Sequence, residues 1–144
     1  MKHCLTAVLS LAAIVMLWSC HSQEKEMEKV AYGYLMATGN YMIDDAMPYA
    51  TKATREVTLP FLKNTLIPLT DTNYIISNTP ATIKITEIAL GNDTAAVSYV
   101  KTTPLKTQNS TIYMIKEDGK WLVDVPLQLP DFMQAATPTD TASY

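Results

Sequence analysis

The sequence of residues 112–125 is IYMIKEDGKWLVDV, and this stretch decides the fold. Ile112 to Lys116 and Trp121 to Val125 are rich in the β-branched and aromatic residues that favour strands. Asp118-Gly119 lies between them, and this dipeptide is a strong signal for a two-residue hairpin turn. The stretch therefore predicts two antiparallel strands, and Pro126 is predicted to end the second.

Upstream of the hairpin, the apolar residues keep the period of two that is typical of strands. Thr82 to Leu90 predicts a long strand whose apolar residues change face near Thr86-Glu87, which indicates a β-bulge. Ala95, Val97 and Tyr99 alternate along the next strand. Three shorter features are predicted in this half of the chain: a turn over 91–93, a strand over 74–77 and a polar loop over 106–110.

Closer to the N-terminus the apolar spacing changes to three and four residues, which indicates amphipathic helices. This spacing predicts a helix from Glu24 to Thr38. Gly39-Asn40 is predicted to end that helix, because both residues tolerate a left-handed cap. Asp44-Asp45 predicts the N-terminal cap of a short second helix that runs through Tyr49.

A third helical segment is predicted from Thr51 to Ile67. Pro60 predicts a kink or a new helix start inside it, because proline lacks an amide hydrogen and its ring clashes with the preceding turn. Pro68 is predicted to end the segment. Helices followed by antiparallel strands indicate an α+β fold class, with N-terminal helices packed on a curved antiparallel sheet of about four strands.

The N-terminal segment carries a targeting signal. Lys2 precedes an apolar run from Leu5 to Trp18, which is shorter than the ~20 residues of a membrane-spanning helix. The run ends in Leu17-Trp18-Ser19-Cys20, which resembles the lipobox of bacterial lipoproteins. We therefore expect a signal peptide over residues 1–19 and expect Cys20 to become the lipid-bearing first residue of the mature protein.

This interpretation sets the domain boundaries and the address. The signal peptide covers 1–19, a lipid-anchored tether 20–25, one α+β domain 26–128, and a Thr/Pro-rich tail with a composition typical of disorder 129–144. The lipid makes the membrane an expected partner and the cell envelope the expected location. His21 follows the cysteine, which by resemblance to enterobacterial sorting favours the outer membrane.

The composition excludes several chemistries. Cys4 and His3 leave with the signal peptide, so Cys20 and His21 at the tether are the remaining cysteine and histidine. The domain therefore lacks the residues for Ser-His-Asp or Cys-His catalysis and for the usual zinc sites, and no metal or cofactor is expected. The sequence has no basic cluster, so nucleic acid is not an expected partner.

Three motifs carry a family resemblance. They are the element from Tyr41 to Ala50, the turn and strand from Gly91 to Val97, and the hairpin from Lys116 to Asp124. With the order of the elements, they resemble small bacterial lipoproteins with a domain of unknown function of the nuclear transport factor two-like (cystatin-like cone) superfamily. The resemblance implies helices on the concave sheet face and a conical pocket for a small apolar or amphipathic ligand. It also implies a convex sheet face that forms homodimers.

Five residues are candidates to line this pocket: Tyr34, Tyr99, Tyr113, Trp121 and Asp124. Phenol rings suit sterols, aromatics or sugars. If Trp121 faces the helices, Asp124 faces solvent; in the reversed phase, Asp124 is a buried carboxylate that suits a general base. The first phase is favoured, because tryptophan is the more plausible core residue.

Several functions are compatible with these features. The leading hypothesis is a non-enzymatic, lipid-anchored module that binds a small ligand or a protein. The alternatives are an isomerase- or dehydratase-like enzyme that uses a pocket Asp and Tyr, as the resemblance implies, and a structural subunit of the envelope. Asp93-Thr94-Ala95 and Asp140-Thr141-Ala142 also match an O-glycosylation pattern of some bacterial lineages, which makes Thr94 and Thr141 candidate sites.

Overall fold

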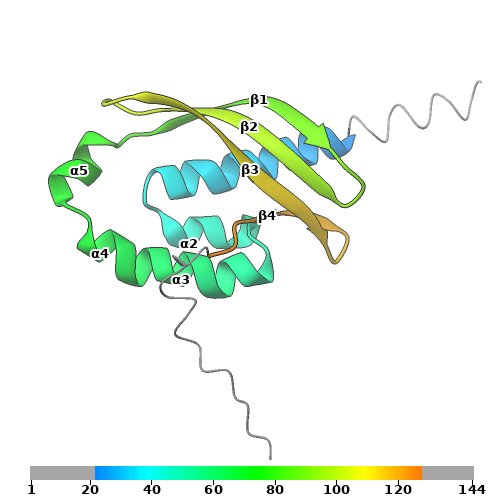
Figure 1. Cartoon of the computed structure of the whole chain (residues 1–144), viewed down its shortest axis with the longest axis horizontal. Helices are drawn as coiled ribbons and strands as arrows, with labels where there is room; N and C mark the ends of the chain where they lie inside the picture. The colour runs from blue at the N-terminus through cyan, green and yellow to red at the C-terminus, as the bar shows by residue number, and fades with distance from the viewer. Residues whose placement is uncertain (1–21, 128–144) are drawn as a thin grey trace, which may run out of the picture.

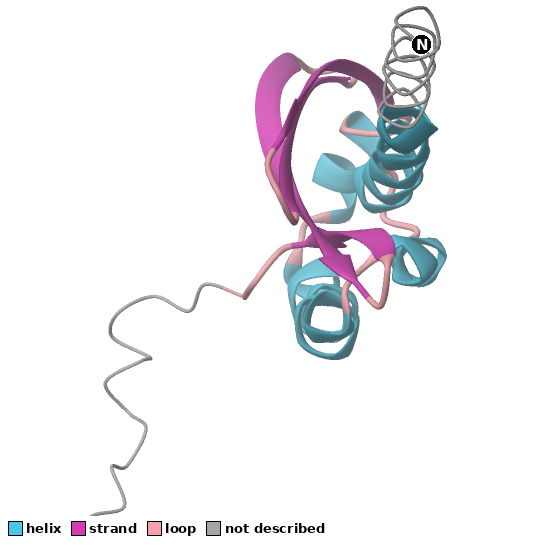
Figure 2. Ribbon diagram, turned by 90° about the vertical axis from the view of Figure 1, so that its right-hand side faces the viewer, coloured by secondary structure: helices cyan, strands magenta, loops and turns pink. Residues whose placement is uncertain are grey.

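The strands form one curved antiparallel sheet, and the helices pack against it, so the predicted α+β class is confirmed (Figure 1). The computed structural model describes residues 22–127. The sheet has the order β1-β2-β3-β4, in which each strand pairs with its neighbour in sequence. Its strands are β1 (Thr82–Leu90), β2 (Thr94–Thr102), β3 (Thr107–Glu117) and β4 (Lys120–Asp124). Figure 2 shows the sheet curling around the N-terminal helix.

The sheet curves because β1 contains the predicted bulge. The pairing of β1 with β2 shifts register between Ile85 and Glu87, and an extra residue of this kind bends a strand. The shift returns Ile88 to the concave face, which faces the helices. The predicted hairpin is also confirmed, because Asp118 and Gly119 have φ angles of 50° and 77°, as a type I′ turn requires.

The N-terminal helix covers residues 22–39 in the described part of the chain and confirms the predicted helix. The reason given for its end is wrong, because Tyr41, and neither Gly39 nor Asn40, has the positive φ angle, 61°. Asn40 instead uses its side chain. Its Oδ1 accepts from Ala81 N at 2.8 Å and its Nδ2 donates to Ala81 O at 3.1 Å, which joins the helix end to the start of β1.

The second helix is α2 (Ile43–Ala46), continued by the short 3₁₀ turn η1 (Met47–Tyr49). The predicted cap by Asp44 or Asp45 is wrong, because Met42 is the N-cap residue and no side chain caps the helix. Both aspartates lie in the first turn instead, where a carboxylate favours the positive end of the helix dipole.

A single long helix covers residues 52–69 and passes through both prolines. It contains α3 (Leu59–Phe61) and α4 (Ile67–Leu69), each preceded by a π-helical turn, η2 (Thr54–Thr58) and η3 (Leu62–Leu66). The kink or new start predicted at Pro60 corresponds to a change from π-helix to α-helix at Leu59 within a continuous helix, and the helix ends at Leu69, one residue after the predicted Pro68. The wider turns explain the continuous helix, because the residue before each proline donates to the carbonyl five residues back and the ladder bypasses the missing amide.

Two other predictions of secondary structure are wrong. The predicted strand over 74–77 belongs to helix α5 (Thr72–Ser77). Asp71 caps this helix, since its carboxylate accepts from the amides of Asn73 at 2.8 Å and Tyr74 at 3.1 Å. The predicted polar loop over 106–110 is mostly strand, because residues 107–110 pair with β2.

The narrow end of the cone is filled by apolar side chains. Met27, Leu59, Met114 and Val123 have no exposed surface, and Trp121 is 3% exposed. Each fully buried large side chain contributes about 1.5–3 kcal/mol. The concave face is open at its other end, as burial along β2 falls from Ala95 and Val97 to half-buried residues beyond them.

A row of threonines joins the long helix to the end of the sheet. Thr51, Thr54 and Thr58 share one helix face and are buried. Thr54 Oγ1 accepts from Val125 N at 2.8 Å, and Thr58 Oγ1 donates to Val125 O at 2.7 Å. Thr51 caps the helix by accepting from Thr54 N at 3.3 Å. The row therefore satisfies the backbone of Val125 after β4 has ended.

Candidate ligand-binding site

Two tyrosines meet at the open end of the cone. Tyr34 comes from the N-terminal helix and is 4% exposed, and Tyr99 is half-buried on the concave face of β2. Tyr99 lies on this face because it alternates with the buried Val97, as the sequence predicts. Burial, with a smaller effect of Tyr99, raises the pKa of Tyr34 to about 12. The Tyr34 phenol therefore stays protonated and neutral near pH 7.

The Tyr34 side chain is buried, but its hydroxyl has no protein partner. No described residue forms a hydrogen bond with it. Within residues 22–127, Trp121 Nε1 is the only side-chain polar atom that both lacks a hydrogen-bond partner and is inaccessible to solvent. The Tyr34 oxygen also lacks a partner, so it must be accessible to water.

Lys101 shares the concave face with these tyrosines. It follows Tyr99 by two residues on β2 and pairs in register with Gln108 of β3. A Cβ atom at Gly39 would be 3.7 Å from Lys101 Nζ, so the amine lies against the end of the N-terminal helix. Burial, and then the nearby cation of Lys106, lower the pKa of Lys101.

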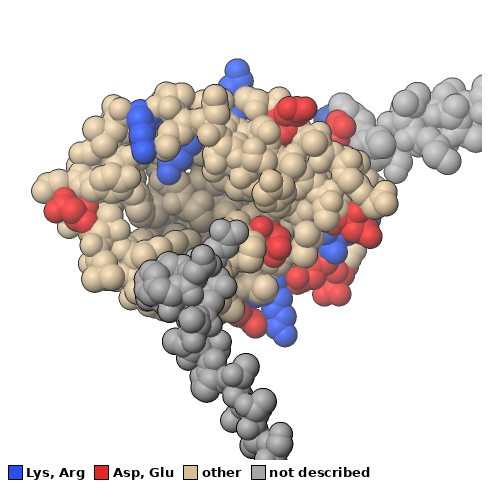
Figure 3. All heavy atoms as spheres, in the orientation of Figure 1, with Lys and Arg blue, Asp and Glu red and all other residues tan. Residues whose placement is uncertain are grey.

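A hollow marks this end of the molecule. Figure 3 shows it between the sheet and the α4 and α5 helices, in the orientation of Figure 1. Basic side chains gather on its rim over the ends of β2 and β3. The concave residues of β3 there, Gln108 and Ser110, are exposed. β4 pairs with β3 only over Tyr113 to Glu117. The earlier part of β3, which lies beside the hollow, has no β4 partner on that edge.

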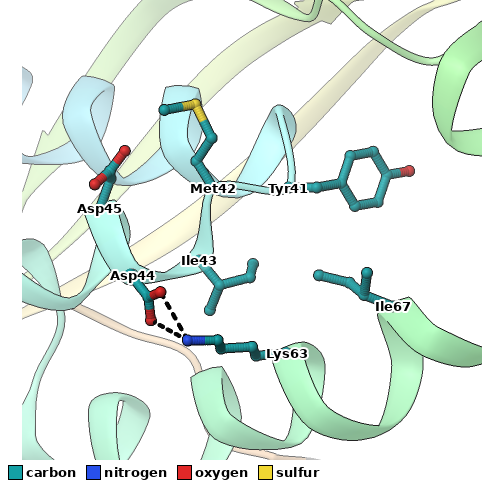
Figure 4. Close-up of a pocket in the computed structure, with 7 residues that line it drawn as sticks. All are labelled: Tyr41, Met42, Ile43, Asp44, Asp45, Lys63 and Ile67. Atoms are coloured by element: carbon teal, nitrogen blue, oxygen red, sulfur yellow. Dashed lines mark hydrogen bonds and ion pairs between the residues drawn. The ribbon is translucent and has the colours of Figure 1, made fainter.

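A second hollow lies between α2 and the long helix (Figure 4). It has a volume of about 270 Å³ and is lined by Tyr41, Met42, Ile43, Asp44, Asp45, Lys63 and Ile67. Lys63 Nζ lies 2.7 Å from Asp44 Oδ2, and both side chains are largely exposed. Burial and the phenol of Tyr74 raise the pKa of Tyr41, whose positive φ angle is strained for a bulky residue.

The structure brings Tyr34 and Tyr99 together but places the other three candidates elsewhere. Tyr113 is 63% exposed on the convex face. Trp121 faces the helices in the core, with Lys116 Nζ 6.0 Å from its ring. Asp124 pairs in register with Tyr113 and accepts from Thr51 Oγ1 at 2.9 Å, so it is half-buried beside the long helix.

Of the two glycosylation candidates and the lipid site, only Thr94 lies in the described part of the chain. Thr94 is exposed at the start of β2. Thr141 and Cys20 lie outside the described residues, as do most of the predicted signal peptide and tail. Glycosylation of Thr94 and Thr141 and lipidation of Cys20 therefore stay predictions.

The sequence interpretation missed Lys101 and the threonine row. Lys101 continues the alternation of Ala95, Val97 and Tyr99, so this pattern places it on the concave face. The threonines are spaced by three and four residues, which places them on one helix face. Lysine and threonine are mostly exposed in proteins, so their residue type alone does not indicate a position inside the fold.

Two negative findings apply to residues 22–127. No group of three or more His, Cys, Asp or Glu side chains could hold a metal ion there. No helix in this part is both long enough and apolar enough to cross a membrane.

The fold is similar to solved structures of low sequence identity. A Campylobacter jejuni protein described as a candidate NTF2-like transpeptidase superposes with a TM-score of 0.50 over 67% of this chain and 94% of that chain, at 16% identity. An NTF-2 like protein of unknown function from Shewanella oneidensis has a TM-score of 0.46, covers 69% and 93%, and is 18% identical. No protein-family model and no curated protein sequence matches the chain. The element order, the curved sheet and the first superposition together give this chain the nuclear transport factor two-like (NTF2-like) fold.

Proposed function

We propose that this chain is a lipid-anchored protein of the cell envelope that holds a small amphipathic ligand at the open end of its cone. The observation that carries the proposal is the hydroxyl of the buried Tyr34 side chain, which has no protein partner and remains open to solvent. A hydrogen bond that replaces a bond to water contributes about 0.5–1.5 kcal/mol, so a ligand that bonds to Tyr34 gains about this amount.

The walls around this hydroxyl suit a ligand with an apolar body. The rings of Tyr34 and Tyr99 provide aromatic surface, and Ile85, which pairs in register with Tyr99 on the neighbouring strand β1, adds apolar surface. The exposed Gln108 and Ser110 lie at the outer part of the same face. A ligand with an apolar body and a polar end fits this gradient.

The position of Asp124 favours binding over proton transfer. An isomerase-like reaction at this site needs a carboxylate beside the tyrosines to move the proton. Asp124 is bonded to Thr51 and shares a sheet face with the exposed Tyr113, so it does not serve Tyr34 or Tyr99. The enzyme hypothesis therefore lacks its predicted base, and the binding hypothesis needs none.

The lipid anchor at Cys20 is the other half of the proposal. The lipobox-like Leu17 to Cys20 supports it. The described part of the N-terminal helix begins at one end of the molecule in Figure 1, and the hollow lies toward the other end. A tether at the start of this helix would leave the ligand site unobstructed.

Binding is tested with the full-length chain in a mild detergent, titrated with 2-naphthamide by isothermal calorimetry against detergent alone. We expect one saturable site, which Tyr34→Phe weakens about threefold to tenfold because one hydrogen bond is lost. Tyr113→Phe is the matched control, because it removes the same atom from an exposed tyrosine of the convex face. A titration without saturation, or equal losses in the two variants, would contradict the proposal.

The anchor is tested separately by partitioning the protein produced in a Gram-negative host between Triton X-114 and water. We expect the wild-type protein in the detergent phase, with a mass that includes acyl chains on Cys20. Cys20→Ser should move the chain out of the lipoprotein pathway and remove those chains. An unmodified Cys20 in the mature protein would refute the anchor and would leave the binding proposal standing.

A further inference from the structure

We infer that the ligand of the cone is an organic anion, whose carboxylate or similar acidic head binds Lys101 while its apolar body lies against Tyr34 and Tyr99. This inference rests on the proposed function, since it names the class of ligand for the same site. It assigns a role to a half-buried cation that the fold itself leaves uncompensated.

The first step is the position of Lys101. Its place two residues after Tyr99 puts both side chains on the concave face. It pairs in register with Ile83 on one side and with Gln108 on the other, and neither carries a charge. Its amine lies near Gly39, so the side chain bends toward the N-terminal helix, which also carries Tyr34.

The second step is the missing counter-charge. The described residues contain one ion pair, between Lys63 and Asp44, and Lys101 takes part in no hydrogen bond or ion pair among them. The charged group that acts on Lys101 is Lys106, also a cation, and both burial and this neighbour lower the pKa of Lys101. A half-buried cation beside a second cation attracts an anion from solution.

The third step is the chemistry of the available groups. A lysine ammonium has three donors and no acceptor, and a phenol hydroxyl donates one hydrogen bond. Tyr99 and Lys101 therefore offer donors from the same face of β2, and Tyr34 lies near Tyr99. A carboxylate has only acceptors when it is ionised, and its hydrogen bonds to charged donors are the stronger kind.

A purely structural role for Lys101 makes a different prediction. The amine lies near the C-terminal end of a helix, where a cation favours the negative end of the helix dipole. Under that role, replacing Lys101 lowers stability and leaves the preference for charged ligands unchanged. The test therefore measures this preference as a ratio of two affinities and does not use stability alone.

The experiment compares 2-naphthoate with the neutral 2-naphthamide on the full-length chain in detergent, each titrated against detergent alone. We expect the anion to bind about tenfold tighter to the wild-type chain. Lys101→Gln should bring the ratio close to one, and Lys101→Arg should keep most of it. Lys84→Gln is the matched control, because Lys84 is exposed on the convex face of β1 and its loss should leave the ratio unchanged.

Each outcome bears on one of the two proposals. Equal affinities of both probes for the wild-type chain, or a preference that survives Lys101→Gln, would overturn the anion inference and leave the binding function intact. Absence of binding by both probes would refute the proposed function itself. If Lys101→Gln fails to fold, the wild-type ratio is measured from 50 to 500 mM salt, and a ratio that does not fall with salt overturns the inference.

Discussion

Thr54→Val should destabilise the domain by about 2–3 kcal/mol, although it keeps the shape of the side chain. Thr54 is fully buried, and its Oγ1 accepts from Val125 N at 2.8 Å and lies 3.0 Å from Thr51 Oγ1. Valine fills the same space, so the cost of a cavity is small. The cost comes from the Val125 amide, which loses its acceptor, and from the weakened contact with Thr51.

The effect is measured by thermal and urea unfolding of the full-length chain, followed by far-ultraviolet circular dichroism. A loss of about 2 kcal/mol lowers the melting temperature of a domain of this size by roughly 10 °C. Thr54→Ser keeps the hydroxyl and should cost about 1 kcal/mol for the lost methyl group. Thr65→Val makes the same chemical change on the exposed side of the same helix and should stay within about 0.5 kcal/mol of the wild type.

The reasoning is refuted if Thr54→Val is as stable as the wild type, or if Thr65→Val is as damaging. Either result would mean that the threonine row does not hold the end of the sheet against the long helix. The two valine variants have the same change in composition and helix propensity, so their difference isolates the buried hydrogen bonds.

Three further predictions use other parts of the structure. The raised pKa of Tyr34 favours the protonated native state, so stability should be full below pH 10 and fall by up to about 3 kcal/mol as the pH rises toward 12; Tyr34→Phe should remove this loss in urea unfolding at stepped pH, and an unchanged slope would exclude Tyr34 as its source. Gly33→Ala should cost about 1–2 kcal/mol, because its Cβ would lie 2.5 Å from the Tyr49 ring. Gly39→Ala, whose Cβ would lie at an ordinary 3.4 Å from its neighbour, should be neutral or stabilising, so melting temperatures that shift alike would contradict this comparison. Trp121→Phe should change stability by less than about 1.5 kcal/mol, since loss of ring area is offset by removal of the buried, unpartnered Nε1–H; a larger loss in urea unfolding would show that this group has a partner.

The sequence predicted the features whose cause is local. The hairpin depends on Asp118-Gly119, which adopt positive φ angles at low cost, and the bulge follows from the change of face in the apolar pattern between Ile85 and Ile88. Prediction from strand propensity was wrong where a side chain forms hydrogen bonds with the backbone. Tyr74 and Ile75 have strand propensity, but the carboxylate of Asp71 caps the first turn of α5 and makes the segment helical.

The sequence predicts the part of the candidate site that lies on β2, since alternation along this strand puts Tyr99 on the concave face. The sequence does not predict that Tyr99 lies near Tyr34. The two residues are far apart in the chain and meet only when the sheet closes over the N-terminal helix. The same closure brings Lys101 against Gly39. Alternation also separates Tyr99 from Tyr113, which lies out of phase with the buried Ile112 and Met114 and is exposed.

The sequence by itself determined the α+β class, the hairpin, the bulge and the helical face of the N-terminal segment, because each depends on neighbours a few residues away. Tertiary structure decided that the helix continues through Pro60, since packing of the long helix holds π-helical turns that local propensity disfavours. It also decided that Asp124 bonds to Thr51 outside the cone and that Lys101 remains without a counter-charge inside it. The burial of a side chain and its hydrogen-bond or charge partners depend on how the helices pack against the sheet, so the sequence of a single segment does not determine them.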